Sequence, residues 1–336
     1  MIRIDDIKFN ENYYNLLVDY LINATGLNLN YYRKNHIEKR IKSRMIRVNC
    51  NTFESYYNYL LEKPSETKNF LDCFNINYSV FFRNWEVFKQ FEKIFLYSLY
   101  LKKDDIISDL EPNPERQYQR IQRNLSSHSK KPKKVSLNRI ISQTSLYRKI
   151  WNGLDSEGTI NIWSCPCANG EEPYSIAMIL DNLKKQTPGF SKYRIIASDI
   201  DGDAIKRAKI GVYKEDSTKD VSKYYDDNYF VKKKENCGFI YSINKKIQDS
   251  IEFIEEDVTK GHQTSLKYDI IFCRYLLIYI SRKIRKVFLN IIESRLNPGG
   301  LLILGKTESL LNSQCDLKLI DTSNCIYIKR GGLNLN

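Results

Sequence analysis

The chain has 336 residues, 42% of them hydrophobic, and a formal net charge of +13. It is long enough for one large domain or two ordinary ones, and apolar enough to bury a core. No apolar run reaches the roughly 18–20 residues that a membrane-spanning helix needs, so we expect no membrane insertion. The first residues include acids and no apolar segment, so we expect no secretory signal and a cytoplasmic protein. The basic balance favours nucleic acid, an anionic membrane surface or an acidic protein as partner, unless it reflects a lysine-rich proteome.

The eight cysteines are scattered along the chain, and no two of them form a C-x-x-C pair. Without a secretory signal, this pattern indicates buried, reduced thiols rather than disulfides. Cys165 and Cys167 flank Pro166, but there are only three histidines and no second pair of cysteines with ligand spacing. We therefore predict no metal site.

Residues 1–75 have the pattern of a small all-helical domain. Apolar side chains recur at helical spacing until Gly26, where the first helix is expected to end. A strongly basic helix is predicted over residues 33–48, with apolar residues every three or four positions on one face and cations on the other. A third helix follows, capped by Thr52 or Asn51.

The composition changes in residues 76–158. Ten Lys and Arg, and no Asp or Glu, lie between Arg116 and Lys149. The centre of this stretch, SSHSKKPKK, cannot form a packed core, so we predict a linker with a flexible, lysine-rich insertion. Contact with nucleic acid is the alternative role for these lysines.

Residues 159–336 alternate short apolar strands with helices, which is typical of a mostly parallel sheet covered on both faces. The predicted fold class is therefore α/β, with a Rossmann-like, doubly wound sheet after the helical domain. A small antiparallel β excursion is expected near residues 229–250, and the long helix SRKIRKVFLNIIESRL is expected to end at NPGG. The predicted strands are TINIWSC, YRIIASD, SIEFIEED, KYDIIFC, GLLILG and CIYIKR.

Ligands of such sheets bind beyond the carboxyl ends of the strands, so the residues after each strand indicate the ligand. The first strand leads into CPCANGEE, which lacks the glycine and lysine patterns of phosphate sites and instead places two acids at a helix start. Asp199 ends the second strand, where an acid can accept hydrogen bonds from a ribose diol, and Asp257 follows the third. A ligand with a ribose, an adenine, cationic groups and no phosphate is S-adenosylmethionine, which is the predicted cofactor.

Four segments resemble the chemotaxis receptor glutamate methyltransferases of the CheR type. They are GEEPYSIAM, ASDID, FCRYLLIYI with PGGLLILGKTESL, and NYSVFFRN, which is similar to the family's Asn-x-Thr-x-Phe-Phe-Arg. The resemblance covers nearly the whole chain, including the helical domain, and the exception is the insertion around residues 97–150. It implies a class I methyltransferase fold with S-adenosylmethionine as cofactor and S-adenosylhomocysteine as product.

The resemblance also implies roles for single residues. Arg83 and Tyr279 would act in catalysis, Arg83 by orienting a substrate carboxylate through its planar guanidinium. Each role has a structural alternative. Arg83 could be a surface residue after a buried phenylalanine pair, and Tyr279 could pack its ring on the sheet. The two acids that start the helix, Glu171 and Glu172, could serve only to stabilise the helix dipole. Asp201 is expected to cap the following helix. The implied cofactor-binding residues are Asn77, Ser79, Arg83, Glu172, Asp199, Asp257, Val258, Tyr275 and Leu276.

The sequence departs from the family pattern at three places near these residues. Ser79 replaces the family's threonine and keeps its hydroxyl, whereas Tyr275 replaces an asparagine and loses its amide. Ala168 and Asn169 stand where the family has serine and threonine, which removes two hydroxyl groups. These changes predict a modified cofactor pocket.

The implied reaction transfers a methyl group to a glutamate side-chain oxygen of a chemotaxis receptor, giving a methyl ester. A glutamate with a pKa of ~4.3 is ionised at neutral pH, so the reaction needs no general base. The implied partner is the cytoplasmic helical domain of methyl-accepting receptors, drawn in by the basic helix; in some relatives the β excursion also binds a receptor tail peptide. The implied substrate-recognition residues are Arg33, Lys34, Lys39, Arg40, Arg44 and Arg47.

Two other functions compete with this reading. The charge and the lysine-rich segment favour a nucleic-acid methyltransferase, but CRYLLIY replaces the Asn/Asp-Pro-Pro-Tyr signature of amino-group methylation, so no nucleic-acid partner is expected. Tyr275 in place of asparagine favours a non-catalytic scaffold that binds S-adenosylmethionine.

Overall fold

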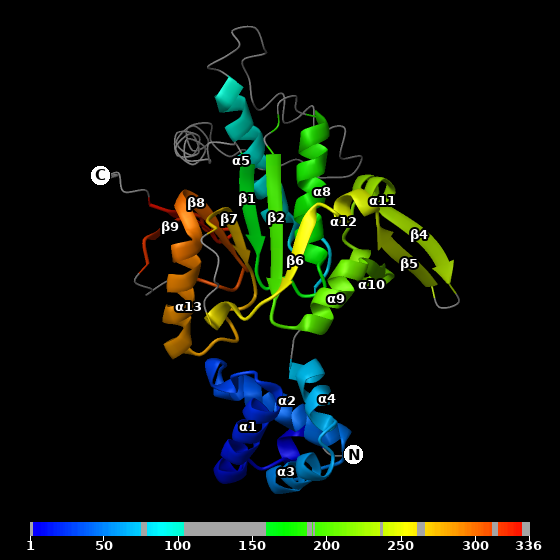
Figure 1. The fold of residues 1–336 in the computed structure, drawn as a ribbon, viewed down its shortest axis with the longest axis vertical. Coiled ribbons are helices and arrows are strands. Elements are labelled where there is room, and N and C mark those ends of the chain that lie inside the picture. Colours follow the sequence, from blue (N-terminus) through cyan, green and yellow to red (C-terminus); the bar gives the residue numbers. More distant parts are fainter. Residues whose placement is uncertain are drawn as a thin grey trace. The chain divides into compact units, whose positions relative to one another are not determined.

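The computed structural model describes residues 3–74, 79–103, 159–186, 190, 192–235, 238–260, 266–310 and 315–330. The chain forms two compact units (Figure 1). The smaller one consists of Met1–Asn77 and Tyr275–Leu289, and the larger one of Tyr78–Arg274 and Asn290–Asn336. The lysine-rich segment and Asn77 lie outside the described residues, so the predicted insertion stays a prediction.

The smaller unit is helical, as its apolar spacing predicts. The Asn10 side chain accepts a hydrogen bond from the Tyr13 N–H and starts the first helix, and Gly26, with φ of 71°, ends it. Thr52, rather than Asn51, caps the third helix through the Ser55 N–H. The elements are η1 Ile4–Asp6, α1 Glu11–Thr25, η2 Leu29–Tyr31, α2 Lys34–Arg47, α3 Phe53–Glu62 and α4 Glu66–Phe74.

A buried ion pair joins α2 to α4. Arg44 donates from Nε and Nη2 to the two oxygens of Glu66, at 2.7 and 2.8 Å. Tyr56 and Asn69 also donate to this carboxylate, at 3.2 and 2.9 Å. Burial opposes ionisation of Glu66, but the hydrogen bonds from Arg44 and Asn69 outweigh it and hold its pKa below the usual value. Arg44 was predicted to face a partner; it is instead 8% exposed and its guanidinium is already used inside the unit.

The larger unit is built on a seven-stranded sheet in the order β6-β2-β1-β7-β8-β10-β9. β6, β2, β1, β7 and β8 are parallel, and β10 runs antiparallel to both of its neighbours. This arrangement confirms the predicted mostly parallel sheet, and the carboxyl ends of its five parallel strands share one edge (Figure 1). The strands are β1 Thr159–Ser164, β2 Lys192–Asp199, β6 Ile251–Glu255, β7 Tyr268–Cys273, β8 Leu296–Leu304, β9 Leu317–Asp321 and β10 Ile326–Lys329.

Most helices of the larger unit lie between its strands along the chain, and α5 precedes β1. None of the helices in the described ranges, in either unit, is long and apolar enough to cross a membrane. α13 begins in the smaller unit and ends in the larger one. The elements are α5 Trp85–Lys103, α8 Glu171–Gln186, α9 Gly202–Ile210, α10 Glu215–Thr218, α11 Lys223–Tyr229, α12 Lys245–Gln248, η3 Val258–Lys260 and α13 Arg282–Arg295.

One face of the sheet packs against α5 and α8. Ile162, Ile270 and Phe272 of the strands form an apolar cluster with Phe91 of α5 and Ile176 of α8. The Phe91 and Phe272 rings lie 5.1 Å apart. Each fully buried side chain of this size contributes about 1.5–3 kcal/mol, so the cluster fixes both helices on the sheet. The segment 79–103, predicted as part of a linker, therefore belongs to the larger unit.

The start of β8 differs from the prediction. The motif NPGG, residues 297–300, was expected to separate the long helix from the last parallel strand, but β8 already begins at Leu296. The pairing of β7 with β8 shifts register between Tyr268 and Ile270, opposite this motif. Such an irregularity accommodates a proline and two glycines within a strand.

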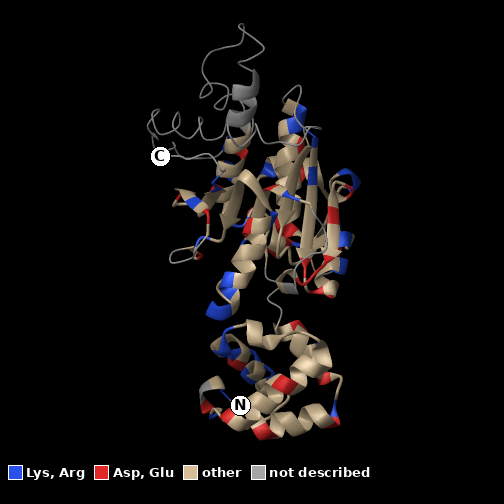
Figure 2. Ribbon diagram, turned by 60° about the vertical axis from the view of Figure 1, so that its left-hand side comes forward, with Lys and Arg blue, Asp and Glu red and all other residues tan. Residues whose placement is uncertain are grey.

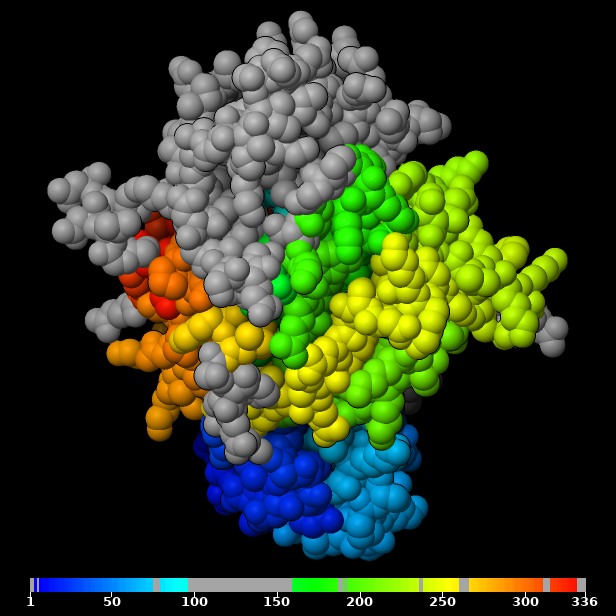
Figure 3. Space-filling model, turned by 45° about the horizontal axis from the view of Figure 1, so that its top comes forward, coloured from blue at the N-terminus to red at the C-terminus, as the bar shows by residue number. Residues whose placement is uncertain are grey.

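A second, antiparallel sheet has the order β3-β5-β4 and corresponds to the expected β excursion. Its strands are β3 Val212–Lys214, β4 Phe230–Glu235 and β5 Gly238–Ile243. The hairpin of β4 and β5 projects from the unit (Figure 3). The Phe81 ring contacts those of Tyr213 and Phe230, at 4.8 and 5.0 Å, and so joins this sheet to the segment before α5.

The Arg44–Glu66 pair generates a stability prediction. Arg44→Ala leaves the buried Glu66 carboxylate without its cation, so we expect a loss of about 3 kcal/mol in the free energy of unfolding at neutral pH. Because the pKa of Glu66 is lowered in the folded protein, this difference should shrink as the pH falls below the unfolded pKa of the carboxyl group. Urea denaturation of both proteins, with exposed Arg47→Ala as the control, tests this. Equal midpoints for Arg44→Ala and Arg47→Ala would contradict it.

Candidate functional site

The turn between β1 and α8, residues 165–170, lies across the carboxyl edge of the sheet. The Cys165 N–H donates to the Phe272 carbonyl at the end of β7, at 2.9 Å. The Cys167 N–H donates to the Ser198 carbonyl at the end of β2, also at 2.9 Å. The turn is therefore fixed to both strands that flank β1.

The second half of this turn is held from the side of α9 and β3. Tyr213 donates its hydroxyl hydrogen to the Asn169 carbonyl at 2.6 Å, and Arg207 donates from Nε to the Asn169 side chain at 2.8 Å. Gly170 has φ of 97°, and a Cβ there would lie 3.0 Å from Ala208 Cβ and from the Tyr213 hydroxyl. Only glycine fits this position. Asn169, which replaces a family hydroxyl residue, thus has a structural role in this chain.

Asp199 is fixed by backbone donors on both of its oxygens. Oδ2 accepts from the Ala168 N–H at 2.8 Å, and Oδ1 accepts from the Asp201 N–H at 3.0 Å. The side chain is 7% exposed, and burial raises its pKa to about 6 although these backbone donors oppose the rise. Each carboxylate oxygen keeps a further lone pair for a ligand.

Asp201 caps α9, as the sequence predicts. Its Oδ1 accepts from the N–H groups of Asp203 and Ala204, at 2.9 and 3.2 Å. These two donors are backbone groups that a helix start leaves without an intrahelical partner.

Glu172 forms a buried ion pair with Arg274, the residue directly after β7. Arg274 Nη1 lies 3.0 Å from Glu172 Oε2, and the Ser164 hydroxyl donates to Oε1 at 2.8 Å. Arg274 Nη2 also donates to the Arg83 carbonyl and to Asn84 Oδ1, at 2.8 Å each. Arg274 is only 4% exposed. It therefore links β7, α8 and the segment that contains Arg83.

Sequence reasoning assigned no role to Arg274, although the residue stands inside the CRYLLIY motif. The available signal was an arginine directly after a strand that is apolar on both faces, at the edge where ligands bind. A charged group in that position needs a buried partner. The partner, Glu172, lies 102 residues away in sequence, and no local pattern connects the two.

The described part of the NYSVFFRN segment, residues 79–84, forms a fixed turn before α5. The Phe81 N–H donates to the Ser217 carbonyl and the Phe82 N–H to the Ser175 hydroxyl, both at 2.9 Å. Phe81 and Phe82 are fully buried, as the structural alternative for Arg83 requires. Ser79 and Arg83 are half-buried. The catalytic role of Arg83 stays a prediction.

Glu171, the neighbour of Glu172, is a buried acid with unused hydrogen-bonding capacity. It is 2% exposed, and among the described residues its Oε2 has no hydrogen-bond partner. Burial raises its pKa to about 7. The first turn of α8 therefore holds one acid that is paired inside the protein and one whose Oε2 can accept a hydrogen bond from a ligand.

Asp257 and Val258 follow the edge strand β6. Asp257 Oδ1 accepts from the Thr259 N–H at 3.0 Å and from the Thr259 hydroxyl, and so starts η3. Val258 is 7% exposed. Both are at the carboxyl edge where an adenine was predicted, and their contact with a cofactor stays a prediction.

Tyr275, Leu276 and Tyr279 belong to the smaller unit. Tyr275 has φ of 63°, a left-handed conformation that asparagine adopts more readily than tyrosine. This backbone conformation explains why asparagine suits the position in the family. Leu276 is half-buried. Tyr279 accepts from the Arg33 N–H through its carbonyl, at 2.9 Å, and its ring lies 4.8 Å from the His36 ring.

His36 does not provide a titrating base beside Tyr279. Burial, together with the nearby Arg40 and Lys39, lowers its pKa to about 4. The imidazole is therefore neutral at physiological pH.

The other predicted recognition residues of the basic helix lie at its surface. Lys34 pairs with Glu11 at 2.7 Å. Arg33, Lys39 and Arg47 are exposed and Arg40 is half-buried. Their contact with a substrate stays a prediction.

The described ranges contain no cluster of three or more His, Cys, Asp or Glu side chains that could hold a metal ion. Cys165 and Cys167 are buried, and burial raises the pKa of both thiols well above the usual value. These thiols are therefore protonated at neutral pH.

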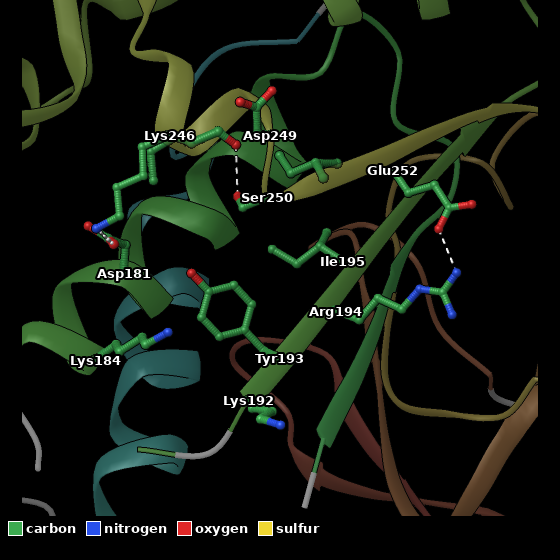
Figure 4. Close-up of a pocket in the computed structure, with 12 residues that line it drawn as sticks. Asp181, Lys184, Lys192, Tyr193, Arg194, Ile195, Lys246, Asp249, Ser250 and Glu252 are labelled. Atoms are coloured by element: carbon green, nitrogen blue, oxygen red, sulfur yellow. Dashed lines mark hydrogen bonds and ion pairs between the residues drawn. The ribbon is translucent and has the colours of Figure 1, made fainter. Parts of the chain in front are cut away.

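One cavity of about 750 Å³ is lined by residues 192–195 at the start of β2 (Figure 4). Asp199 lies at the other end of this strand. Each of the cavity's three acids forms an ion pair: Asp181 with Lys246 at 2.7 Å, Glu252 with Arg194 at 2.6 Å, and Asp249 with Lys245 at 2.7 Å. It is lined by none of the predicted cofactor residues. The chemistry of the site therefore points to the carboxyl edge and not to this cavity.

Comparison with known proteins agrees with this geometry. Residues 139–326 match the model of the CheR methyltransferase S-adenosylmethionine-binding domain, and residues 12–74 match the CheR methyltransferase all-α domain. The chain is similar to the chemotaxis protein methyltransferase of Listeria monocytogenes, with 27% identity over 90% of this chain and 92% of that protein. It is also similar to the one of Borreliella burgdorferi, with 26% identity over 88% of this chain and 87% of that protein.

The first of these models alone matches more than half of the chain, and the second matches the helical unit. The order of the two domains is that of the two structural units, and the acids of the carboxyl edge suit the cofactor that the model names. The chain belongs to the CheR methyltransferase family.

Proposed function

We propose that this methyltransferase transfers the methyl group of S-adenosylmethionine to glutamate side chains of methyl-accepting chemotaxis receptors, forming methyl esters. The family supports a methyltransferase of chemotaxis that uses this cofactor. The observation that carries the finer proposal is the set of buried charges at the carboxyl edge: the fixed Asp199 carboxylate, the Glu171 and Glu172 pair, and the Arg274 guanidinium.

The residues at this edge fit the cofactor. Asp199 offers two oriented acceptors for a ribose diol. Glu171 has a buried oxygen without a hydrogen-bond partner in the described structure, which suits the ammonium group of the methionine moiety, and Glu172 adds a second negative charge. Arg83 and Arg274 are the candidates to bind the carboxylate of the cofactor's methionine moiety. When bound, the cofactor supplies a methyl group on a cationic sulfur.

The chain's own residues then have to position an anion rather than remove a proton. A glutamate carboxylate is ionised at neutral pH, so its methylation needs no general base. Arg83 orients the substrate carboxylate through its planar fork. For Tyr279 the family resemblance implies a separate role, that of an aromatic ring with a hydroxyl donor. Alignment in a site that excludes water supplies the rate, because charge is neutralised as the methyl group moves.

The decisive experiment measures transfer of labelled methyl from S-adenosylmethionine to the cytoplasmic fragment of a chemotaxis receptor, with RNA as the competing acceptor. A labelled product that releases methanol in mild base is the expected ester. Label in RNA, or label on protein that resists base, would refute the proposal. The family and its named relatives support the methyltransferase and give no support to the nucleic-acid or scaffold alternatives.

The role of Asp199 can be tested by calorimetric titration of S-adenosylmethionine. Asp199→Ala removes two acceptors from the ribose, so we expect a loss of roughly 1–3 kcal/mol in binding free energy. Because the pKa of Asp199 is about 6, the wild-type affinity should also fall as the pH drops through that value. Asp203→Ala, which removes an acid from the first turn of α9, is the control and should bind normally. Unchanged affinity in Asp199→Ala would remove this residue from the site.

The proposed role of Arg83 in orienting the substrate carboxylate can be separated from a role in packing. Arg83→Ala should lower turnover by ~10²-fold or more because the carboxylate is no longer oriented, and Arg83→Lys should restore only part of the rate. Cofactor affinity should fall less than turnover. Single-turnover methylation and thermal unfolding are measured on the same preparation. An alanine variant that is less stable but fully active would show that Arg83 only supports the buried phenylalanine pair.

A further inference from the structure

The smaller unit holds Tyr279 in a short antiparallel pairing with the start of the basic helix. Residues 31–33 and 279–281 face each other around an isolated bridge. The N–H groups of Arg33 and Ser281 donate to carbonyls of the opposite segment, at 2.9 and 2.8 Å. Arg33 Nε adds a hydrogen bond to a carbonyl of the opposite segment, at 3.3 Å. α2 and α13 therefore begin within a few residues of Tyr279.

The segment 275–289 is the main source of net charge in this unit. Residues 1–77 contain eleven Lys and Arg against nine Asp and Glu, a net charge of +2. Residues 275–289 add four Lys and Arg and no acid, which raises the net charge to +6. The first turn of α13 contains no acid, and basic residues mark this end of the helix (Figure 2).

The basic helix α2, by contrast, provides less unpaired charge than its sequence indicates, because acids of the same unit neutralise three of its cations. The pairs are Lys34 with Glu11, Lys42 with Glu38, and Arg44 with Glu66. Arg282 and Lys283 are exposed and form no ion pair within the described ranges. They follow Tyr279 by three and four residues, so they lie closer to it along the chain than the cations of the middle of α2.

We propose that Arg282 and Lys283, together with Arg33, form a cationic surface beside Tyr279 that binds acidic side chains on either side of the methyl-accepting glutamate. The partner is an acidic helical segment, because acids three and four residues apart share one face of a helix. This inference rests on the proposed function and names the part of the substrate that the site recognises.

The charge of these residues suits recognition and not catalysis. Exposed cations contribute little to the stability of their own fold, so their loss should leave the unit folded. They increase the rate at which an anionic partner meets the site, and this contribution falls as salt screens it. A substrate without flanking acids should not be methylated faster because of these cations.

The test uses the full chain and the cytoplasmic fragment of a chemotaxis receptor, with methyl transfer as the readout. Arg282→Glu/Lys283→Glu should lower kcat/KM by about tenfold at low ionic strength, and the difference should shrink in about 0.5 M salt. Affinity for S-adenosylmethionine, measured by calorimetry, should not change. The matched control is Lys8→Glu/Lys68→Glu, which changes the charge of the same unit equally at exposed positions elsewhere.

A second arm replaces the acids that flank the target glutamates by their amides, and then by lysines. The amide substrate should reduce the difference between wild type and Arg282→Glu/Lys283→Glu, and the lysine substrate should reverse it. Equal rates for this variant and the Lys8/Lys68 control, with wild type active, would overturn the surface and leave the proposed function intact. A wild-type enzyme that binds cofactor but methylates no receptor fragment would instead refute the proposed function.

Discussion

The ion pair between Arg274 and Glu172 is the interaction on which the carboxyl edge of the sheet depends. Both side chains are buried, and their charges can stay there only because each satisfies the other. Arg274 also donates to the Arg83 carbonyl and to Asn84, and its guanidinium lies over the Phe88 ring, 5.5 Å from its centre. One arginine thus holds the end of β7, the start of α8 and the turn before α5 in a single arrangement.

In the turn after β1, buried polar groups are also satisfied by partners inside the protein, but here the donors are neutral backbone N–H groups. Asp199 accepts the Ala168 N–H, and Ser198 accepts the Cys167 N–H, so the backbone of the turn is fixed by the end of β2. Buried polar groups that are satisfied in this way are rigid, because any movement leaves a donor or an acceptor unpaired. Rigid acids at a strand edge are what a cofactor with a ribose and an ammonium group requires, since binding then costs little reorganisation.

Charge at the surface of the smaller unit depends on pairing as well as on composition. The basic helix has six cations between Lys34 and Arg47, yet half of them are matched by acids of other helices or of its own turn. Arg44 is the clearest case, because its charge stabilises the packing of α2 on α4 and is not available to a partner. The number of cations in this helix therefore overstates the positive charge that it can offer to a partner.

Sequence alone determined most of the helices and strands and the identity of the strand-end residues, but not α5, which lies in a segment predicted as a linker. Periodicity predicts helices and strands because burial acts on local spacing, and the Asp201 cap and the Gly26 stop are local rules of the backbone. Tertiary structure decided which charges meet. Glu172 with Arg274, and Arg44 with Glu66, are pairs between residues 102 and 22 positions apart, so no local pattern predicts them. The start of β8 at Leu296 was also decided by pairing with β7, since strand partners can extend a strand through a motif that locally favours a turn.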